Sequence, residues 1–204
     1  MKMELMQLKT RLKILLTLTA IAIGCKEISV PKPRGHFRID MPQHKYTYFN
    51  GMESETEKMP FSFEYPSFGN LAFNEEYENE RGWFNIEFPA YKAKLYMTYR
   101  GINHDFDELM EQTYKMNVKN HISKADAISE RYFNDEKNKV YGILYDLKGN
   151  TATAVQFYMT DSTRHFLRGS LYFASEPDAD SLDPVIGYFR EDVIHLIETL
   201  RWKE

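Results

Sequence analysis

The stretch from residue 139 to residue 173 most constrains what this protein can fold into. It contains three runs rich in β-branched and aromatic residues, separated by two turn signals, Gly149-Asn150 and residues 161–163. Runs of this kind joined by short turns are typical of neighbouring antiparallel strands. The stretch therefore predicts a three-stranded antiparallel meander.

The middle run and the C-terminal segment predict how this sheet is covered. Val155, Phe157 and Met159 alternate with more polar residues, so one sheet face needs a cover and the other can stay wetter. Asp183-Pro184 is an N-cap followed by a first-turn proline. An apolar stripe at helical spacing follows, formed by Ile186, Phe189, Val193, Leu196, Ile197 and Leu200. We therefore expect an amphipathic helix from residue 183 that lies on the sheet.

The rest of the sequence adds strands and one more helix. Alternating segments predict strands over residues 46–50, 61–65, 83–88, 92–99 and 125–133. Asp105 and Glu108 form a capping box before a helix over 106–118, and a short helix is expected over 71–77. Strand runs broken by single helices indicate an α+β fold, here an antiparallel sheet of about six or seven strands covered by two helices. By topology alone this arrangement resembles the Mog1/PsbP-like sandwich.

The N-terminal segment has the features of a lipoprotein signal. Basic residues precede an apolar run over residues 14–23, which is too short to span a bilayer but suits a signal peptide. Cys25, the single cysteine of the sequence, follows this run and a glycine, where a lipoprotein carries its acylated residue. An ordinary signal peptide or a free thiol is the alternative. We expect a signal peptide over 1–24, a lipidated tether and extended arm over 25–45, and one α+β domain over 46–204.

Composition and motifs argue against several function classes. The formal net charge of −4 offers no basic excess for nucleic-acid binding. Among the six histidines no two have the helical spacing of metal ligands, and no cysteine pair exists. Asp161, Ser162 and His165 are too close in sequence to converge as a catalytic triad, so we interpret Asp161 and Ser162 as turn formers. His195 is interpreted as a histidine at the edge of the apolar stripe. We expect no enzymatic activity, no metal and no cofactor.

Five residues are candidates for binding a protein partner. Arg34, Phe37 and Arg38 lie in an arm flanked by prolines and belong to residue types enriched at protein interfaces. The alternative is that the arm only packs against the domain. Arg164 and Arg168 are expected to share one face of a strand, where they either bind an acidic partner or pair with local carboxylates such as Asp161.

Several segments in order resemble the GldD family of gliding-motility lipoproteins of the Bacteroidetes. They are PKPRGHFRIDMP, FSFEYP, WFNIEFP, KADAI, the block from Lys139 to Phe173, and HLIETLRW. The resemblance implies an outer-membrane lipoprotein linked to gliding and to type IX protein secretion, with Cys25 as the acylated residue. It implies no enzymatic activity.

We therefore expect a non-enzymatic lipoprotein that binds other gliding or secretion lipoproteins or outer-membrane components. Acyl chains on Cys25 would attach it to the membrane. The resemblance to Bacteroidetes lipoproteins implies that export to the cell surface would favour acidic residues soon after Cys25. Only one, Glu27, lies in residues 26–29, so we expect the periplasmic face of the outer membrane. A small-molecule ligand is not expected. The alternative is a periplasmic lipoprotein domain that binds a small ligand or acts as an enzyme, for which a deep pocket with convergent polar groups would be the sign.

Overall fold

The structure is a computed structural model. It describes residues 39–51, 59–73, 82–174 and 179–203 and a few single residues of the leader; for residues 179–181 it gives the backbone alone. The protein divides into two compact units, residues 1–36 and 37–204. All strands and helices described below belong to the second unit.

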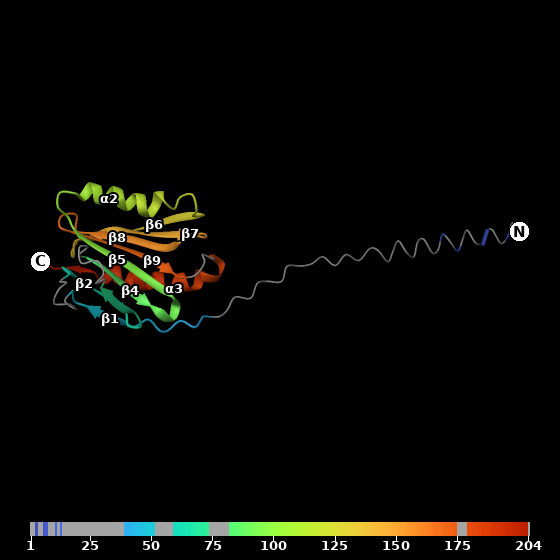
Figure 1. Ribbon diagram of the computed structural model, residues 1–204, viewed down its shortest axis with the longest axis horizontal. Coiled ribbons are helices and arrows are strands. Elements are labelled where there is room, and N and C mark those ends of the chain that lie inside the picture. Colours follow the sequence, from blue (N-terminus) through green and yellow to red (C-terminus); the bar gives the residue numbers. More distant parts are fainter. Residues whose placement is uncertain are drawn as a thin grey trace. The chain divides into compact units, whose positions relative to one another are not determined.

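A seven-stranded antiparallel sheet is the centre of this unit (Figure 1). The predicted meander forms three of its neighbouring strands, and the β4–β5 hairpin turns through the 3-10 helix η1 (Pro89–Tyr91). In spatial order the strands are β3 (Asn70–Phe73), β4 (Trp83–Phe88), β5 (Ala93–Gly101), β9 (His165–Phe173), β8 (Thr153–Thr160), β7 (Val140–Lys148) and β6 (Ala127–Asp135). The predicted α+β fold with a sheet of about seven strands and two helices is confirmed.

A smaller sheet of three strands packs against the large one. It has the order β1 (Tyr46–Phe49), β2 (Phe61–Pro66) and β10 (Arg201–Trp202), all antiparallel. Aromatic rings join the two sheets: Phe61 and Phe63 of β2 lie 5.9 and 6.3 Å from Phe84 of β4, measured between ring centroids. The alternation of aromatic residues in β2 and β4 thus forms a sandwich core.

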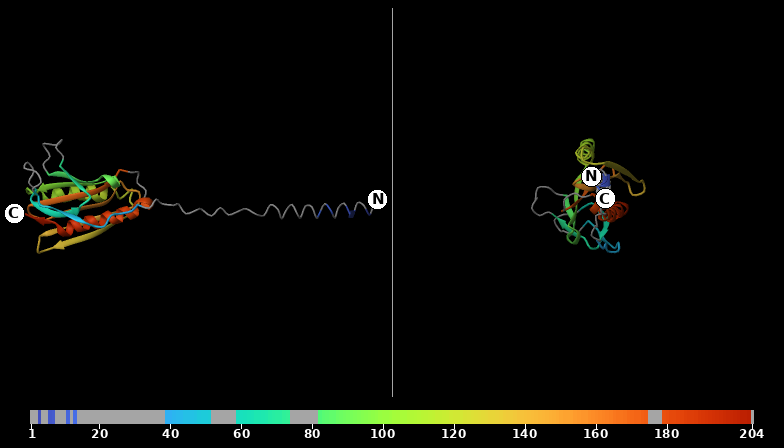
Figure 2. Two further views of the ribbon diagram at one scale, coloured as in Figure 1. Left: turned by 90° about the horizontal axis from the view of Figure 1, so that it is seen from below. Right: turned by 90° about the vertical axis from the view of Figure 1, so that its right-hand side faces the viewer.

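The helix α3 (Ala179–Thr199) covers the same face of the large sheet as β2 does. Its residues Phe189, Val193 and Leu196 are buried in one core with Val155 and Phe157 of β8. Figure 2 gives this arrangement in two further views. The predicted packing of the C-terminal helix on this sheet face is confirmed.

The opposite sheet face is also covered, contrary to the expectation that it stays wetter. The helix α2 (Phe106–Tyr114) and the π-helical turn η2 (Lys115–Lys119) lie on it, on the other side of the sheet from α3 (Figure 1). Leu109 and Val118 pack there against Tyr145 and Tyr158. All eight residues of β8 are therefore buried. A tyrosine that alternates with apolar residues, as Tyr158 does, can pack under a helix as readily as it can face water.

Three local expectations were wrong. Residues 71–73 form β3, because Leu71 and Phe73 pack against the core as a strand beside β4. The last helix begins at Ala179 instead of residue 183, so Pro184 lies inside it. Asp105 precedes α2 but makes no side-chain cap, since its Oδ1 accepts a hydrogen bond from the Asn103 amide instead.

Candidate functional site

Four of the predicted site residues, Cys25, Arg34, Phe37 and Arg38, lie outside the described residues. The described end of the arm begins at Ile39, which is exposed, and Met41 packs against the core. The structure therefore describes only the part of the arm that enters the domain.

Arg164 and Arg168 do not share a strand face. Arg164 is an exposed residue of the turn before β9, and its backbone amide donates to Asp161 Oδ1 at 2.7 Å. Arg168 lies within β9, on the face covered by α2, because its cross-strand partner is Tyr158. Within the described parts of the protein neither arginine forms an ion pair. Of these two arginines, only Arg168 lies in a concave site.

That site is a groove of about 560 Å³ where α2 leaves part of the sheet uncovered. The helix covers β6 to β9, and the open floor continues over β5 and β4. Leu109, Thr113 and Met116 line the helix side, while Trp83 and Tyr96 line the sheet side. We name this hollow the α2 groove.

The guanidinium group of Arg168 is the main charge in the inner part of the α2 groove. Its Nη1 donates one hydrogen bond, to the thioether sulfur of Met116 at 3.2 Å, and its Nε is buried without a hydrogen bond. A thioether is a weak acceptor. Burial lowers the pKa of Arg168, and the hydroxyl of Tyr172 partly opposes this shift. The positive charge of Arg168 is thus partly desolvated, and no carboxylate of the described residues neutralises it.

Other buried polar atoms, on α2, η2 and β8, also lack hydrogen bonds. The Thr113 hydroxyl lines the groove from a side chain that is 1% exposed, and Asn117, one helical turn further, has neither amide atom bonded. Gln156 Nε2 is unbonded, although Gln156 Oε1 accepts from Ser170 in the groove wall at 3.4 Å. Native proteins normally satisfy such atoms with water or a ligand.

The π-helical turn η2 positions one of these groups, Asn117. The amide of Asn120 donates to the carbonyl of Lys115, five residues earlier. The wider turn follows directly on α2, and Asn117 and Val118 are both buried in it. Single π turns of this kind are frequent at functional sites. No pattern in the sequence distinguishes such a turn from an ordinary α-helix, so the prediction of one helix over 106–118 could not find it.

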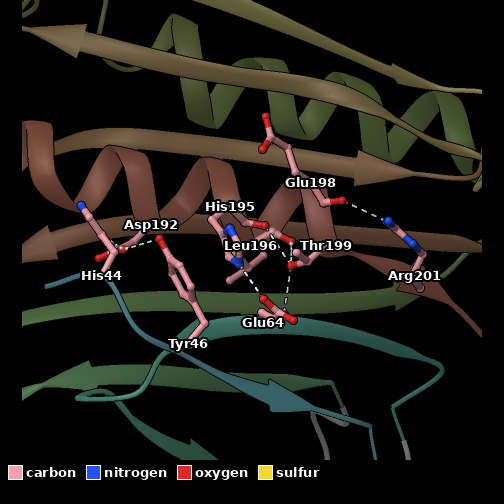
Figure 3. A network of polar contacts seen from close by, with 9 residues as sticks. All are labelled: His44, Tyr46, Glu64, Asp192, His195, Leu196, Glu198, Thr199 and Arg201. Carbon is pink, nitrogen blue, oxygen red and sulfur yellow. Dashed lines mark hydrogen bonds and ion pairs between the residues drawn. The ribbon is translucent and has the colours of Figure 1, made fainter.

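A second group of polar side chains joins the start of the domain to α3 (Figure 3). His44 Nδ1 lies 2.7 Å from Asp192 Oδ1, and His44 Nε2 lies 3.2 Å from a Glu191 carboxylate oxygen. The Tyr46 hydroxyl donates to the same Asp192 oxygen at 3.2 Å. Because both ring nitrogens of His44 contact carboxylates, this histidine connects the segment before β1 to α3 and is not positioned as a catalytic base.

The second half of this group involves His195. Its Nε2 lies 2.7 Å from a Glu64 oxygen, and its ring stacks on Tyr46 with centroids 3.6 Å apart. His195 is therefore at the edge of the stripe, as interpreted, but its carboxylate partner on β2 was missed. Glu64 and His195 are far apart in the sequence, so no local sequence pattern could indicate their contact. We name the group around Asp192 and His195 the α3 clamp.

Burial controls the acid–base behaviour of the α3 clamp. Asp192 is 3% exposed, and this burial raises its pKa, although the hydrogen bond from His44 opposes the shift. Burial, with the charge of Asp192 as a smaller cause, raises the pKa of Tyr188 to about 12. The same two causes raise the pKa of Tyr46. The clamp thus joins β1 and β2 to α3 through polar groups that are partly or fully shielded from water.

The cluster of Asp161, Ser162 and His165 forms a turn, as interpreted. Asp161 Oδ1 accepts hydrogen bonds from the backbone amides of residues 163, 164 and 165. These bonds lower the pKa of Asp161, outweighing the effect of burial, which raises it. Ser162 takes a left-handed conformation with φ 64°. His165 points away from Ser162 toward Tyr99, with its Nδ1 2.8 Å from the tyrosine hydroxyl.

No three metal-binding side chains converge within the described part of the protein. None of the described helices is long and apolar enough to cross a membrane.

Comparisons with known proteins place the sequence beside one family. The family model for the gliding motility lipoprotein GldD matches residues 26–202. Among curated proteins, no sequence matches at a significant level. Among solved structures, the solution structure of cyanobacterial PsbP (CyanoP) from Synechocystis sp. PCC 6803 aligns with a TM-score of 0.45 and 11% identity, covering 84% of this protein and 99% of that one.

Proposed function

Because the protein belongs to the GldD family of gliding-motility lipoproteins, we propose that it acts at the outer membrane by binding other components of the gliding and type IX secretion machinery. The match over residues 26–202 carries this proposal, since it spans the whole domain. The proposed role is non-enzymatic and requires no metal or cofactor.

Attachment through Cys25 is the first part of the proposed mechanism. The family match begins at residue 26, directly after this cysteine, which supports Cys25 as the first residue of the mature protein. Acyl chains there would confine the domain to the membrane surface and raise its effective concentration near membrane-bound partners. The face that we propose for it is the periplasmic one.

Binding surfaces are the second part. The arm with Arg34, Phe37 and Arg38 follows the anchor directly, so it stays near the membrane where such partners are found. Arg168 lies in the α2 groove, and Arg164 is exposed in the turn before β9. Arginine and aromatic residues of these kinds are enriched at interface hot spots.

A small-ligand-binding domain is the second candidate function. The unbonded polar atoms of Thr113 and Arg168 beside the α2 groove favour it. The groove, however, is open and edged by aromatic side chains, with Trp83 40% and Tyr96 46% exposed. Such an edge suits an extended polypeptide better than an enclosed small molecule.

Replacement of the anchor tests the proposed function. Cys25→Ala should move the protein out of the membrane fraction or block its processing, and should impair gliding or secretion. The control substitution Ser29→Ala, four residues further, should leave both unchanged. Wild-type behaviour of the cleaved, unacylated Cys25→Ala protein in both assays would contradict the proposal.

A further inference from the structure

We propose that the α2 groove binds a carboxylate group of a partner polypeptide, with Arg168 as its counter-ion. This inference rests on the proposed role in protein binding and names the site and the chemistry of that contact. The carboxylate belongs either to an acidic side chain or to the C-terminus of the partner, since both present the same two oxygens.

The charge of Arg168 is the first argument. A guanidinium group stays protonated at any physiological pH, and a partly desolvated cation is costly unless an anion pairs with it. Two other arginines of the described domain pair with carboxylates: Arg190 lies 2.7 Å from Asp146 and Arg131 lies 3.3 Å from Glu198. Arg168 has the Met116 sulfur in place of a carboxylate. The missing partner is therefore an anion.

The neighbouring polar atoms are the second argument. The unbonded groups include the Gln156 amide nitrogen, the Asn117 amide nitrogen and the Thr113 hydroxyl, each of which can donate a hydrogen bond. Thr113 lines the groove, Asn117 follows it by one helical turn, and Gln156 contacts Ser170 in the groove wall. Of these residues, Thr113 lines the groove together with Arg168, and two unbonded donors there fit a ligand that only accepts, as an ionised carboxylate does.

The aromatic edge is the third argument, and it indicates a polypeptide as the source. Trp83, Tyr96 and Tyr172 line the open side of the groove and are 37–46% exposed. The rings of Tyr96 and Tyr172 pack edge to face, 5.5 Å apart. Large aromatic side chains around a half-buried arginine are typical of the anchor region of a protein interface.

The density of positive charge favours a carboxylate over a phosphate. Besides Arg168, Arg100 is the single basic residue in the groove lining. The ion pair between Lys94 and Glu87, at 2.7 Å, lies further out on the same sheet face. Lys94 is thus already neutralised by its glutamate. Recognition of a doubly charged phosphate usually uses a cluster of basic residues, which this face lacks among its described residues.

An array of random short peptides tests the inference directly. Each peptide is printed as an amide-blocked form, as a free acid, and with phosphoserine, and the array is probed with the full-length lipoprotein in detergent. We expect the retained peptides to be enriched in Asp, Glu or a free C-terminus. Comparison of the blocked and free forms then distinguishes an acidic side chain from a terminal carboxylate. No binding, binding independent of carboxylates, or enrichment confined to phosphoserine would overturn the inference.

Matched variants assign the binding to the groove. Arg168→Gln should weaken binding of the retained peptides about tenfold or more, since a charge-assisted hydrogen bond is lost. Arg131→Gln, at an exposed arginine of β6 outside the groove lining, should not change it. Equal effects of the two substitutions would contradict the assignment. Circular dichroism checks that both variants fold.

A second variant keeps the test decisive if Arg168→Gln does not fold. Thr113→Val removes a buried hydroxyl that has no hydrogen bond and keeps the side-chain shape. It should raise the melting temperature and weaken peptide binding. A raised melting temperature with unchanged binding would place the ligand elsewhere.

Failure of this inference and failure of the proposed function give different results. If the wild-type lipoprotein and Arg168→Gln recover the same gliding or secretion components from membranes, the protein binds its partners through another surface. If the wild-type protein recovers none, the proposed function itself is wrong.

Discussion

At the scale of single residues, Asp192 is the group whose environment departs most from that of an ordinary surface carboxylate. It is buried, it receives hydrogen bonds from His44 and Tyr46, and one of its oxygens has no hydrogen bond. Carboxylates so placed usually hold a fold together, because removal of one partner leaves another polar group unpaired in the interior. Asp192 thus connects the first described residues of the domain to its last helix.

This position gives the residue-scale prediction. Asp192→Ala should lower the free energy of unfolding by about 2 kcal/mol, the usual range for a hydrogen bond to a charged group. His44→Ala should cost less, because His44 is more exposed. A double-mutant cycle in urea should then give a coupling energy of at least ~0.5 kcal/mol. Strict additivity of the two substitutions would mean that the His44–Asp192 contact does not stabilise the protein.

At the scale of secondary-structure elements, the sequence predicts an element most reliably where its residue pattern is compatible with only one type of secondary structure. The meander over β7, β8 and β9, the β4–β5 hairpin and the apolar stripe of α3 follow from local alternation and turn residues. Leu71 and Phe73 show the limit, because a short segment with mixed apolar residues fits a strand or a helix until β4 is known to lie beside it.

The two candidate sites differ in how far the sequence could predict them. Arg168 was identified as a candidate, but its burial depends on α2, a contact between segments distant in sequence. The α3 clamp was missed because His44, Glu64 and Asp192 come from three separated segments. In both cases tertiary packing, which no local pattern encodes, brings the residues together.

The packing of α3 gives the element-scale prediction. Phe189 is fully enclosed, with its ring 4.8 Å from that of Phe88 and 5.8 Å from that of Phe173. Phe189→Ala should lower the free energy of unfolding by about 3–5 kcal/mol because of lost burial and the cavity it leaves. Glu198→Ala, on the exposed side of the same helix, should change it by less than ~1 kcal/mol. Similar urea midpoints for the two variants would contradict the placement of α3.

At the scale of the whole domain, buried and half-buried tyrosines predict sensitivity to alkali. Burial raises the pKa of Tyr188 to about 12 and raises those of Tyr46, Tyr145 and Tyr158. Unfolded tyrosines ionise near pH ~10, so above that pH the unfolded state loses protons before the folded state does. The stabilisation by these groups is complete below pH ~10 and is lost as the pH rises through the folded pKa values.

Tyrosine absorbance and circular dichroism, followed together, check this prediction. Exposed tyrosines should titrate while the fold persists, and the tyrosines whose pKa burial raises should titrate only as the dichroism signal is lost. Ionisation of every tyrosine near pH ~10 with an unchanged dichroism spectrum would show that the two aromatic cores are not closed to water.

For the whole molecule in its membrane, we propose a lipid-anchored domain that acts by binding other proteins of the gliding and secretion machinery. Affinity isolation of the chemically cross-linked, membrane-anchored protein, followed by mass spectrometry, measures this most directly. We expect recovery of gliding or type IX secretion components with the wild-type protein and their loss with Cys25→Ala. Isolation of wild-type protein at normal abundance without any such component would contradict it.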